Sequence, residues 1–232
     1  MFINSVVALR DRELPNVSKP FVARGSKMKR CQSCLLVEHH CICSLRPVVE
    51  TQCAFCFIFY RGEVFKPSNT GRLIADVVVE NYAFQWQRTD IEPALKALLE
   101  NPEYLPVVVF PHEYAQAEKC IKHPSELEAS KQGRKPLYIV LDGTWREAKK
   151  MFRSAYLKNL PVLGVQPEKA SSYQLREAAH LHQLCTAEVG MAVLKLQGDL
   201  DAAIALEGYF HVFRERYLAG KANVVLKCSA QK

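Results

Sequence analysis

Residues 142–145 bring an acid, a glycine, a hydroxyl and an indole together in four positions. An apolar run over residues 137–141 stops just before them, and a helical pattern begins at Thr144. Glu147 completes the spacing of a capping box with Thr144. In parallel α/β sheets ligands often bind at such a junction. Free backbone N–H groups and the positive end of the helix dipole point into the crevice at the carboxyl end of the strand. The pattern indicates a ligand or catalytic site, although a simple turn and cap would look the same.

Two more segments combine a polar turn with the start of a helix. The first contains Ser68, Asn69 and Thr70, and the second contains Thr186 and Glu188. Each of them alone is more often a helix cap than a site. Parallel strands bring their carboxyl ends to one edge of the sheet, so three such junctions strengthen one another.

A second chemical signal is a cluster of thiols. Four of the nine cysteines lie within residues 31–43, namely Cys31, Cys34, Cys41 and Cys43. Four thiolates at this spacing can surround one Zn²⁺ tetrahedrally and leave no open position, which predicts a structural metal. His39 and His40 lie between the two pairs and offer an alternative ligand. Cys53 and Cys56 lie in a predicted strand, where residues three apart point to opposite faces, so they should not share a metal.

Basic residues gather in two places. The helical pattern after Asp142 carries one stripe, at Arg146, Lys149, Lys150 and Arg153, while Trp145, Ala148 and Phe152 face the other side and should pack on the sheet. Residues 1–30 contain seven basic residues against two acidic ones, within a net charge of +7. Both features suit a polyanion such as RNA, and both also occur as solvated surface.

The apolar periodicity predicts a doubly wound parallel α/β sheet flanked by helices. Strands are expected over residues 53–60, 105–110, 137–141 and 161–164. Helices are expected over residues 73–84, 91–100, 113–131, 144–154, 185–196 and 200–218. We expect an irregular basic arm (1–30), a small zinc knuckle (31–48), a catalytic domain (49–220) and a tail (221–232).

The sequence also argues against several classes of protein. It lacks the glycine-rich dinucleotide motif, the P-loop, the hydrolase nucleophile motif and the zinc-protease motif. It has no apolar run of membrane-spanning length and no secretory leader pattern. We therefore expect a cytoplasmic protein without a membrane partner.

Taken together, these motifs resemble the DTW-domain family. The resemblance rests on Asp142, Thr144 and Trp145, on the cysteine knuckle, and on residues 67–73, 173–176 and 185–188, and it spans roughly residues 31–207. One departure is that many relatives carry a His and a Glu before the segment that begins at Pro67. Here Glu63 is present and the His is absent, so a role for that His does not transfer.

The resemblance implies a SPOUT-like, knotted fold that binds S-adenosylmethionine. It further implies transfer of the 3-amino-3-carboxypropyl group to N3 of a uridine in the variable loop of tRNA, with release of methylthioadenosine. If the chain has this activity, the candidate contacts to S-adenosylmethionine are Ser68, Asn69, Thr70, Asp142, Thr144, Trp145, Thr186 and Glu188. The candidate contacts to tRNA phosphates are Arg72, Arg146, Lys149, Lys150, Arg153 and Arg176.

Asp142 is the candidate catalytic residue. As a general base it would take the N3 proton, and alternatively it would hold the ammonium or ribose hydroxyls of S-adenosylmethionine. Two rival functions remain open. One is a methyltransferase of the same fold, and the other is a non-catalytic, zinc-containing RNA-binding protein. The sequence has no feature that fixes the oligomeric state.

Overall fold

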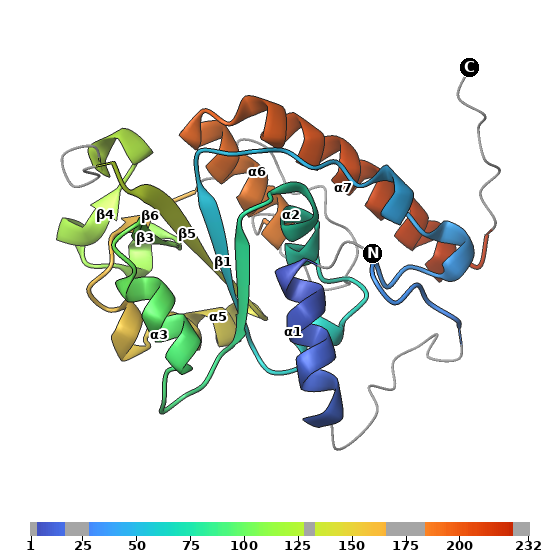
Figure 1. The fold of residues 1–232 in the computed structure, drawn as a ribbon, viewed down its shortest axis with the longest axis horizontal. Helices are drawn as coiled ribbons and strands as arrows, with labels where there is room; N and C mark the ends of the chain where they lie inside the picture. Colours follow the sequence, from blue (N-terminus) through green and yellow to red (C-terminus); the bar gives the residue numbers. More distant parts are fainter. Residues whose placement is uncertain (1–3, 17–27, 128–132, 166–183, 225–232) are drawn as a thin grey trace.

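The computed structural model describes residues 4–16, 28–127, 133–165 and 184–224. Its centre is a parallel sheet of six strands in the order β2-β1-β5-β3-β6-β4 (Figure 1). The strands are β1 (Ala54–Phe59), β2 (Asn81–Gln85), β3 (Tyr104–Val109), β4 (Cys120–Ile121), β5 (Lys135–Asp142) and β6 (Val162–Leu163).

Helices cover both faces of the sheet. They are α1 (Ser5–Glu13), α2 (Gly71–Val77), α3 (Pro93–Glu100), α5 (Trp145–Phe152), α6 (Thr186–Gln197) and α7 (Leu200–Lys221). Core residues of α1, α2, α6 and α7 form one hydrophobic cluster with the sheet, and those of α3 and α5 form another. Among the described helices none is long and apolar enough to cross a membrane.

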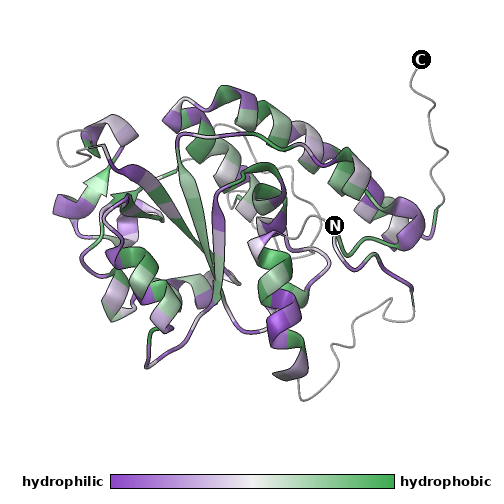
Figure 2. Cartoon of the chain, viewed as in Figure 1, coloured by the Kyte–Doolittle hydropathy of each residue, from purple (hydrophilic) through white to green (hydrophobic). Residues whose placement is uncertain are grey.

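Strand β1 shows why the sheet is buried on both sides. All six of its residues are buried. They are also apolar, which Figure 2 shows in green. Phe55, Phe57 and Phe59 belong to the cluster of α1, α2, α6 and α7, whereas Cys56 belongs to the cluster of α3 and α5. Cys53 lies in the first cluster, so Cys53 and Cys56 are on opposite faces, as the alternation of side chains along a strand requires.

The predicted fold class is confirmed, since the sheet is parallel and flanked by helices. Each of the four predicted strands is present as β1, β3, β5 or β6. The capping box of α5 is present too, because Thr144 and Glu147 each bind the backbone of the other. The knotted arrangement stays a prediction, because residues 166–183, between β6 and α6, lie outside the described residues.

Two of the predicted helices are wrong. The expected helix over residues 73–84 ends at Val77, and Asn81–Gln85 forms strand β2 instead. The expected helix that starts at residue 113 is replaced, as far as the described chain extends, by short 3₁₀ turns and by β4. Consecutive valines favour extended backbone in the first case, and Pro124 interrupts a helix in the second.

Part of the expected N-terminal arm is a core helix. Helix α1 buries Val6 and Leu9, and Asn4 caps it by accepting a hydrogen bond from the N–H of Val7. The side-chain amide of Asn4 also donates to Asp76 of α2. The charged residues that follow Leu9, at positions 10–13, hid a short helix that packs against α2 and β2. The remainder of the basic segment, residues 17–27, lies outside the described residues.

Candidate active site and metal centre

Asp142 is the last residue of β5, and its side chain is only 4 % exposed. Its Oδ1 accepts a hydrogen bond from Nδ2 of Asn69 (2.9 Å), and its Oδ2 accepts one from Oγ1 of Thr186 (2.9 Å). Asn69 lies in the turn before α2, and Thr186 is the first residue of α6. One carboxylate therefore ties three chain segments together at the carboxyl edge of the sheet.

Thr70 joins the same group of residues. Its hydroxyl oxygen accepts a hydrogen bond from the backbone N–H of Ala187 in the first turn of α6 (3.1 Å). Asn69 and Thr70 are both buried, and Ser68 beside them is also buried. We refer to Asn69, Thr70, Asp142 and Thr186 as the Asp142 cluster. Two of the three predicted junctions thus meet the end of β5 through direct hydrogen bonds.

Gly71 has a steric role in this cluster. A Cβ atom at this position would lie 2.7 Å from Oδ2 of Asp142 and 3.4 Å from Cγ2 of Thr186. Carbon and oxygen atoms do not approach so closely without displacement. The turn before α2 can therefore lie against the carboxylate only because residue 71 has no side chain.

Glu188 and Cys185 serve the N-terminus of α6. Oε2 of Glu188 accepts a hydrogen bond from the N–H of Cys185 (2.8 Å), which is the capping-box arrangement. Burial raises the pKa of the Cys185 thiol, and the nearby Glu188 carboxylate raises it further. Cys185 is consequently a neutral thiol at physiological pH and a poor nucleophile.

Thr144 and Trp145 lie apart from the Asp142 side chain. The hydroxyl of Thr144 is 2.7 Å from Oε2 of Glu147, within the capping box of α5. The indole of Trp145 stacks on Phe110 and meets Tyr114 edge to face. These contacts belong to the α3 and α5 side of the sheet, whereas the register partner of Asp142, Phe59, belongs to the opposite side.

The basic stripe of α5 lies on the surface, as its spacing predicts. Arg146, Lys150 and Arg153 are exposed, and Lys149 is partly exposed. Aromatic rings, which the sequence did not reveal, accompany the two lysines. Lys149 Nζ lies over Tyr114 and Trp145, and Lys150 Nζ lies over Tyr60 and Trp86.

Arg72 does not join this stripe. Its side chain is buried, with the guanidinium 5.1 Å from the ring centre of Phe213 and Nη2 donating to the carbonyl of Pro67 (2.6 Å). Arg72 thus supports the backbone of the turn that carries Asn69, and a phosphate could reach it only after rearrangement. Arg176, the other predicted RNA contact beyond α5, lies outside the described residues.

The four predicted zinc ligands do gather in space. The Sγ atoms of Cys31, Cys34, Cys41 and Cys43 all lie within 4.8 Å of one another. The Cys31–Cys43 pair is 3.6 Å apart and the Cys34–Cys41 pair is 3.8 Å apart. Zn–S bonds of about 2.3 Å in a tetrahedron put neighbouring sulfurs roughly 3.8 Å apart. The donor set therefore fits one Zn²⁺.

The electrostatics of these thiols favour a bound cation. Burial acts to raise the pKa of Cys31, but N–H groups of Cys34 and Ser33 outweigh it and lower that pKa to about 7. Burial raises the pKa of Cys34 to about 11, and neighbouring thiolates contribute to this rise. Four thiolates this close repel one another, and a divalent cation removes that repulsion.

His40 does not take a ligand position. It is fully buried, and its Nε2 lies 2.9 Å from the carbonyl oxygen of Val224. The knuckle packs through this histidine and Val37 onto Gly220 at the end of α7. Leu36 and Ile42 enter the core cluster of α1, α2, α6 and α7. The cysteine knuckle is thus built into the main core.

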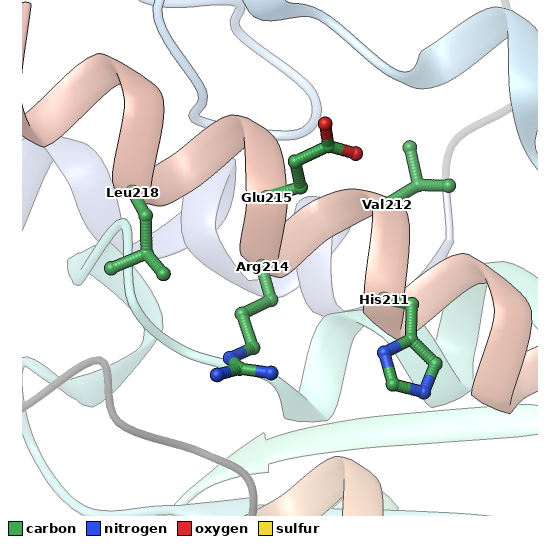
Figure 3. Close-up of a pocket in the computed structure, with 5 residues that line it drawn as sticks. All are labelled: His211, Val212, Arg214, Glu215 and Leu218. Carbon is green, nitrogen blue, oxygen red and sulfur yellow. The ribbon is translucent and has the colours of Figure 1, made fainter.

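A surface pocket lies along α7. Its lining comes from that helix alone and consists of His211, Val212, Arg214, Glu215 and Leu218 (Figure 3). Both His211 and Arg214 point to one side of the helix in this view. None of the five is among the residues that the sequence predicted for the site, so we assign the pocket no part in it.

Comparison with known proteins gives one result for sequence and one for structure. The model of a protein family described as the DTW domain matches residues 28–218. The match begins before the cysteine knuckle and includes all six strands, α6 and most of α7. No solved structure matches the chain.

Proposed function

Since the chain belongs to the DTW-domain family, which is known for tRNA modification, we propose that it is an aminocarboxypropyltransferase acting on tRNA. It would move the 3-amino-3-carboxypropyl group of S-adenosylmethionine to N3 of a uridine in the variable loop. The products would be the modified tRNA and methylthioadenosine. The observation that carries the proposal is the Asp142 cluster, in which a buried carboxylate meets two helix starts at one sheet edge.

The reaction is a displacement at carbon. The lone pair of N3 forms a bond to the methylene carbon next to the sulfonium, and the carbon–sulfur bond breaks. Its electron pair goes to sulfur, which leaves as the neutral thioether, and the N3 proton goes to a base or to water. The sulfonium is already an activated leaving group. The task of the protein is therefore to bring the correct one of three carbons on sulfur in line with N3.

Asp142 suits a positioning role better than that of a mobile base. Both of its oxygens already accept hydrogen bonds, from Asn69 and from Thr186, which fix the plane of the carboxylate. Within the Asp142 cluster the carboxylate is the group that carries negative charge, which the ammonium group of a ligand complements. We assign Asp142 to the ammonium group of the aminocarboxypropyl arm. With that group fixed, the methylene carbon rather than the methyl group faces the uridine.

The remaining predicted residues receive smaller roles. Ser68 and Thr70 line the turn beside Asp142, and Glu188 holds the start of α6. Thr144 and Trp145 lie at the same sheet edge but on the face covered by α3 and α5. We place the incoming RNA there, rather than S-adenosylmethionine. Arg146, Lys149, Lys150 and Arg153 are assigned to tRNA phosphates, because they are exposed or partly exposed along α5 and at its C-cap, and α5 begins near that edge.

One structural Zn²⁺ completes the proposal. Cys31, Cys34, Cys41 and Cys43 would hold it, and a closed set of four thiolates supplies rigidity rather than catalysis. Arg46, three residues after Cys43, pairs with Asp76 of α2 (2.8 Å). Metal binding would thus stabilise the packing behind the turn that carries Asn69.

Identification of the co-product tests the proposed reaction. The purified protein is incubated with unmodified tRNA and S-adenosylmethionine, and small molecules are separated by chromatography. We expect methylthioadenosine in equal amount to modified uridine. S-adenosylhomocysteine would instead establish a methyltransferase. If neither forms and calorimetry detects no binding of S-adenosylmethionine, the proposed reaction is contradicted and the alternative of a non-catalytic RNA-binding protein stands.

A further inference from the structure

Aromatic side chains form two groups on either side of α5. In one group Tyr60 and Trp86 stack, with ring centres 5.4 Å apart and planes 19° from parallel. In the other, Trp145 stacks on Phe110 at 5.4 Å and meets Tyr114 at 5.5 Å. We call Tyr60, Trp86, Tyr114 and Trp145 the aromatic surface.

The backbone places this surface at the same sheet edge as the Asp142 cluster, on the opposite face of the sheet. The N–H of Tyr60 donates to the carbonyl of Asp142 (2.8 Å), and the N–H of Trp86 donates to the carbonyl of Phe59 (2.8 Å). Both bonds continue the strand ladder by one residue past the carboxyl ends of β1 and β2. Trp145 follows β5 after two residues. The aromatic surface and Asp142 therefore share one edge of the sheet.

These rings are accessible, unlike the aromatic residues of the core. Tyr114 is 39 % exposed, and Tyr60, Trp86 and Trp145 are partly exposed. The indole N–H of Trp86 donates to Oγ of Ser154 (2.9 Å), which fixes the orientation of that ring. Two tryptophans at the surface, oriented before any partner arrives, are suited to stack with a flat ligand.

Positive charge surrounds the aromatic surface. Lys149 Nζ lies 5.5 Å from the ring centre of Tyr114, and Lys150 Nζ lies 5.2 Å from that of Trp86. Exposed arginines lie within two residues of these side chains in sequence or at the two ends of α5, at positions Arg61, Arg88, Arg146 and Arg153. Of the acids nearby, Glu147 is engaged by Thr144, and Glu113 is exposed beside Tyr114. Flat apolar faces interleaved with cations fit unpaired nucleobases and their phosphates.

We propose that the aromatic surface stacks unpaired bases that flank the modified uridine, while Lys149 and Lys150 move from the rings to the adjacent phosphates. This inference rests on the proposed function in that it takes RNA as the substrate. It adds that the RNA must present a single-stranded loop, with bases turned outward along α5. It also assigns Tyr60, Trp86 and Tyr114 a binding role that the motifs did not indicate.

The intrinsic fluorescence of the protein gives a direct test. Both tryptophans of the chain, Trp86 and Trp145, belong to the aromatic surface. The full-length protein is titrated, without S-adenosylmethionine, with a uridine pentanucleotide and with an abasic oligonucleotide of the same phosphate backbone. We expect quenching and at least tenfold tighter binding with the pentanucleotide, since stacking contributes about this much per base. Equal binding without quenching would overturn the proposal and leave phosphate contact alone.

Variants separate stacking from general damage. Trp86→Ala and Tyr60→Ala should each weaken pentanucleotide binding about tenfold and leave abasic binding nearly unchanged, whereas Trp86→Phe should retain most of the affinity. Lys195→Ala, at an exposed lysine of α6, is the control and should bind as the wild type does. Thermal melting checks that each variant folds. If Trp86→Ala melts normally and binds the pentanucleotide like wild type, the proposal is wrong.

The two proposals fail differently in this design. Base-dependent quenching without any product on tRNA would contradict the proposed reaction but support the aromatic surface. Product formation without base-dependent quenching would support the proposed reaction and contradict the role of the aromatic surface.

Discussion

Thr186 Oγ1 donates to Asp142 Oδ2 over 2.9 Å, and this bond joins the start of α6 to the end of β5. Asn69 binds the other oxygen of the same carboxylate from the turn before α2. The three segments are far apart in the sequence, so their meeting depends on the parallel sheet. A single buried carboxylate thereby sets the relative positions of two helix starts.

The variant Asp142→Asn should preserve the fold and lose the activity. An Asn amide can accept from Asn69 and donate to the Thr186 hydroxyl, so both hydrogen bonds can be kept. It cannot offer negative charge to an ammonium group. We expect a melting temperature near that of wild type and binding of S-adenosylmethionine weakened at least about tenfold, since hydrogen bonds to charged groups contribute roughly 1.5–3 kcal/mol. Calorimetry measures the affinity.

Unchanged affinity with a collapsed kcat would instead make Asp142 the general base. Full activity with unchanged melting would remove it from the site.

The variant Gly71→Ala should damage the Asp142 cluster by steric conflict. The new methyl group would lie 2.7 Å from Oδ2 of Asp142. We expect a loss of about 1–3 kcal/mol in the free energy of unfolding, together with weaker binding of S-adenosylmethionine. Urea denaturation and calorimetry measure the two effects.

Gly208 of α7 offers a matched control, because a Cβ there meets nothing within 4 Å. Gly208→Ala should stabilise the protein by about 0.5–1 kcal/mol through helix propensity. Equal effects of the two substitutions would contradict the steric account of Gly71.

Elemental analysis should find one zinc per chain. Chelation should lower the melting temperature by more than about 5 °C, or roughly 2 kcal/mol for a chain of this size, because the folded state would lose the binding free energy of the metal. Cys34→Ser should lose the metal, whereas Cys120→Ser, at a thiol outside the cluster, should retain it. A stable, metal-free wild-type protein would contradict the zinc assignment.

Removal of two arginines from α5 should change the salt dependence of tRNA binding. The double variant Arg146→Ala, Arg153→Ala loses two exposed cations, one in the first turn of α5 and one at its C-cap. The slope of log affinity against log salt should become shallower by about 1–2, because fewer counterions are released. Filter binding at several salt concentrations measures the slope. A double variant at Lys96 and Lys195, exposed on other helices, should keep the wild-type slope.

The capping box at Thr144 shows what local sequence can predict. The bonds between Thr144 and Glu147 span three residues, so neighbouring residue types determine them. The same holds for β1, whose six apolar residues are buried on both faces. The four cysteines also lie close in sequence, and their spacing alone was enough to predict that they gather.

Long-range contacts explain where the sequence was insufficient. Residues 77–79 are three valines at the end of an apolar helix pattern. The segment that follows them forms strand β2 because it pairs with β1, and this pairing cannot be seen in the local sequence. Helix α1 looked like part of a charged arm because the contact that fixes it is long-range. Asn4 binds Asp76 of α2, and the two residues are far apart in the sequence. Trp145 lies near Asp142 in sequence. It nevertheless packs with Phe110 on the face of the sheet that α3 and α5 cover, opposite the Asp142 side chain.

The most direct measurement compares two labels on S-adenosylmethionine. The protein is incubated with unmodified tRNA and with S-adenosylmethionine labelled either in the methyl group or in the carboxyl carbon of its methionine part. The account predicts that the carboxyl label enters tRNA and the methyl label does not. Entry of the methyl label alone would contradict it and identify a methyltransferase.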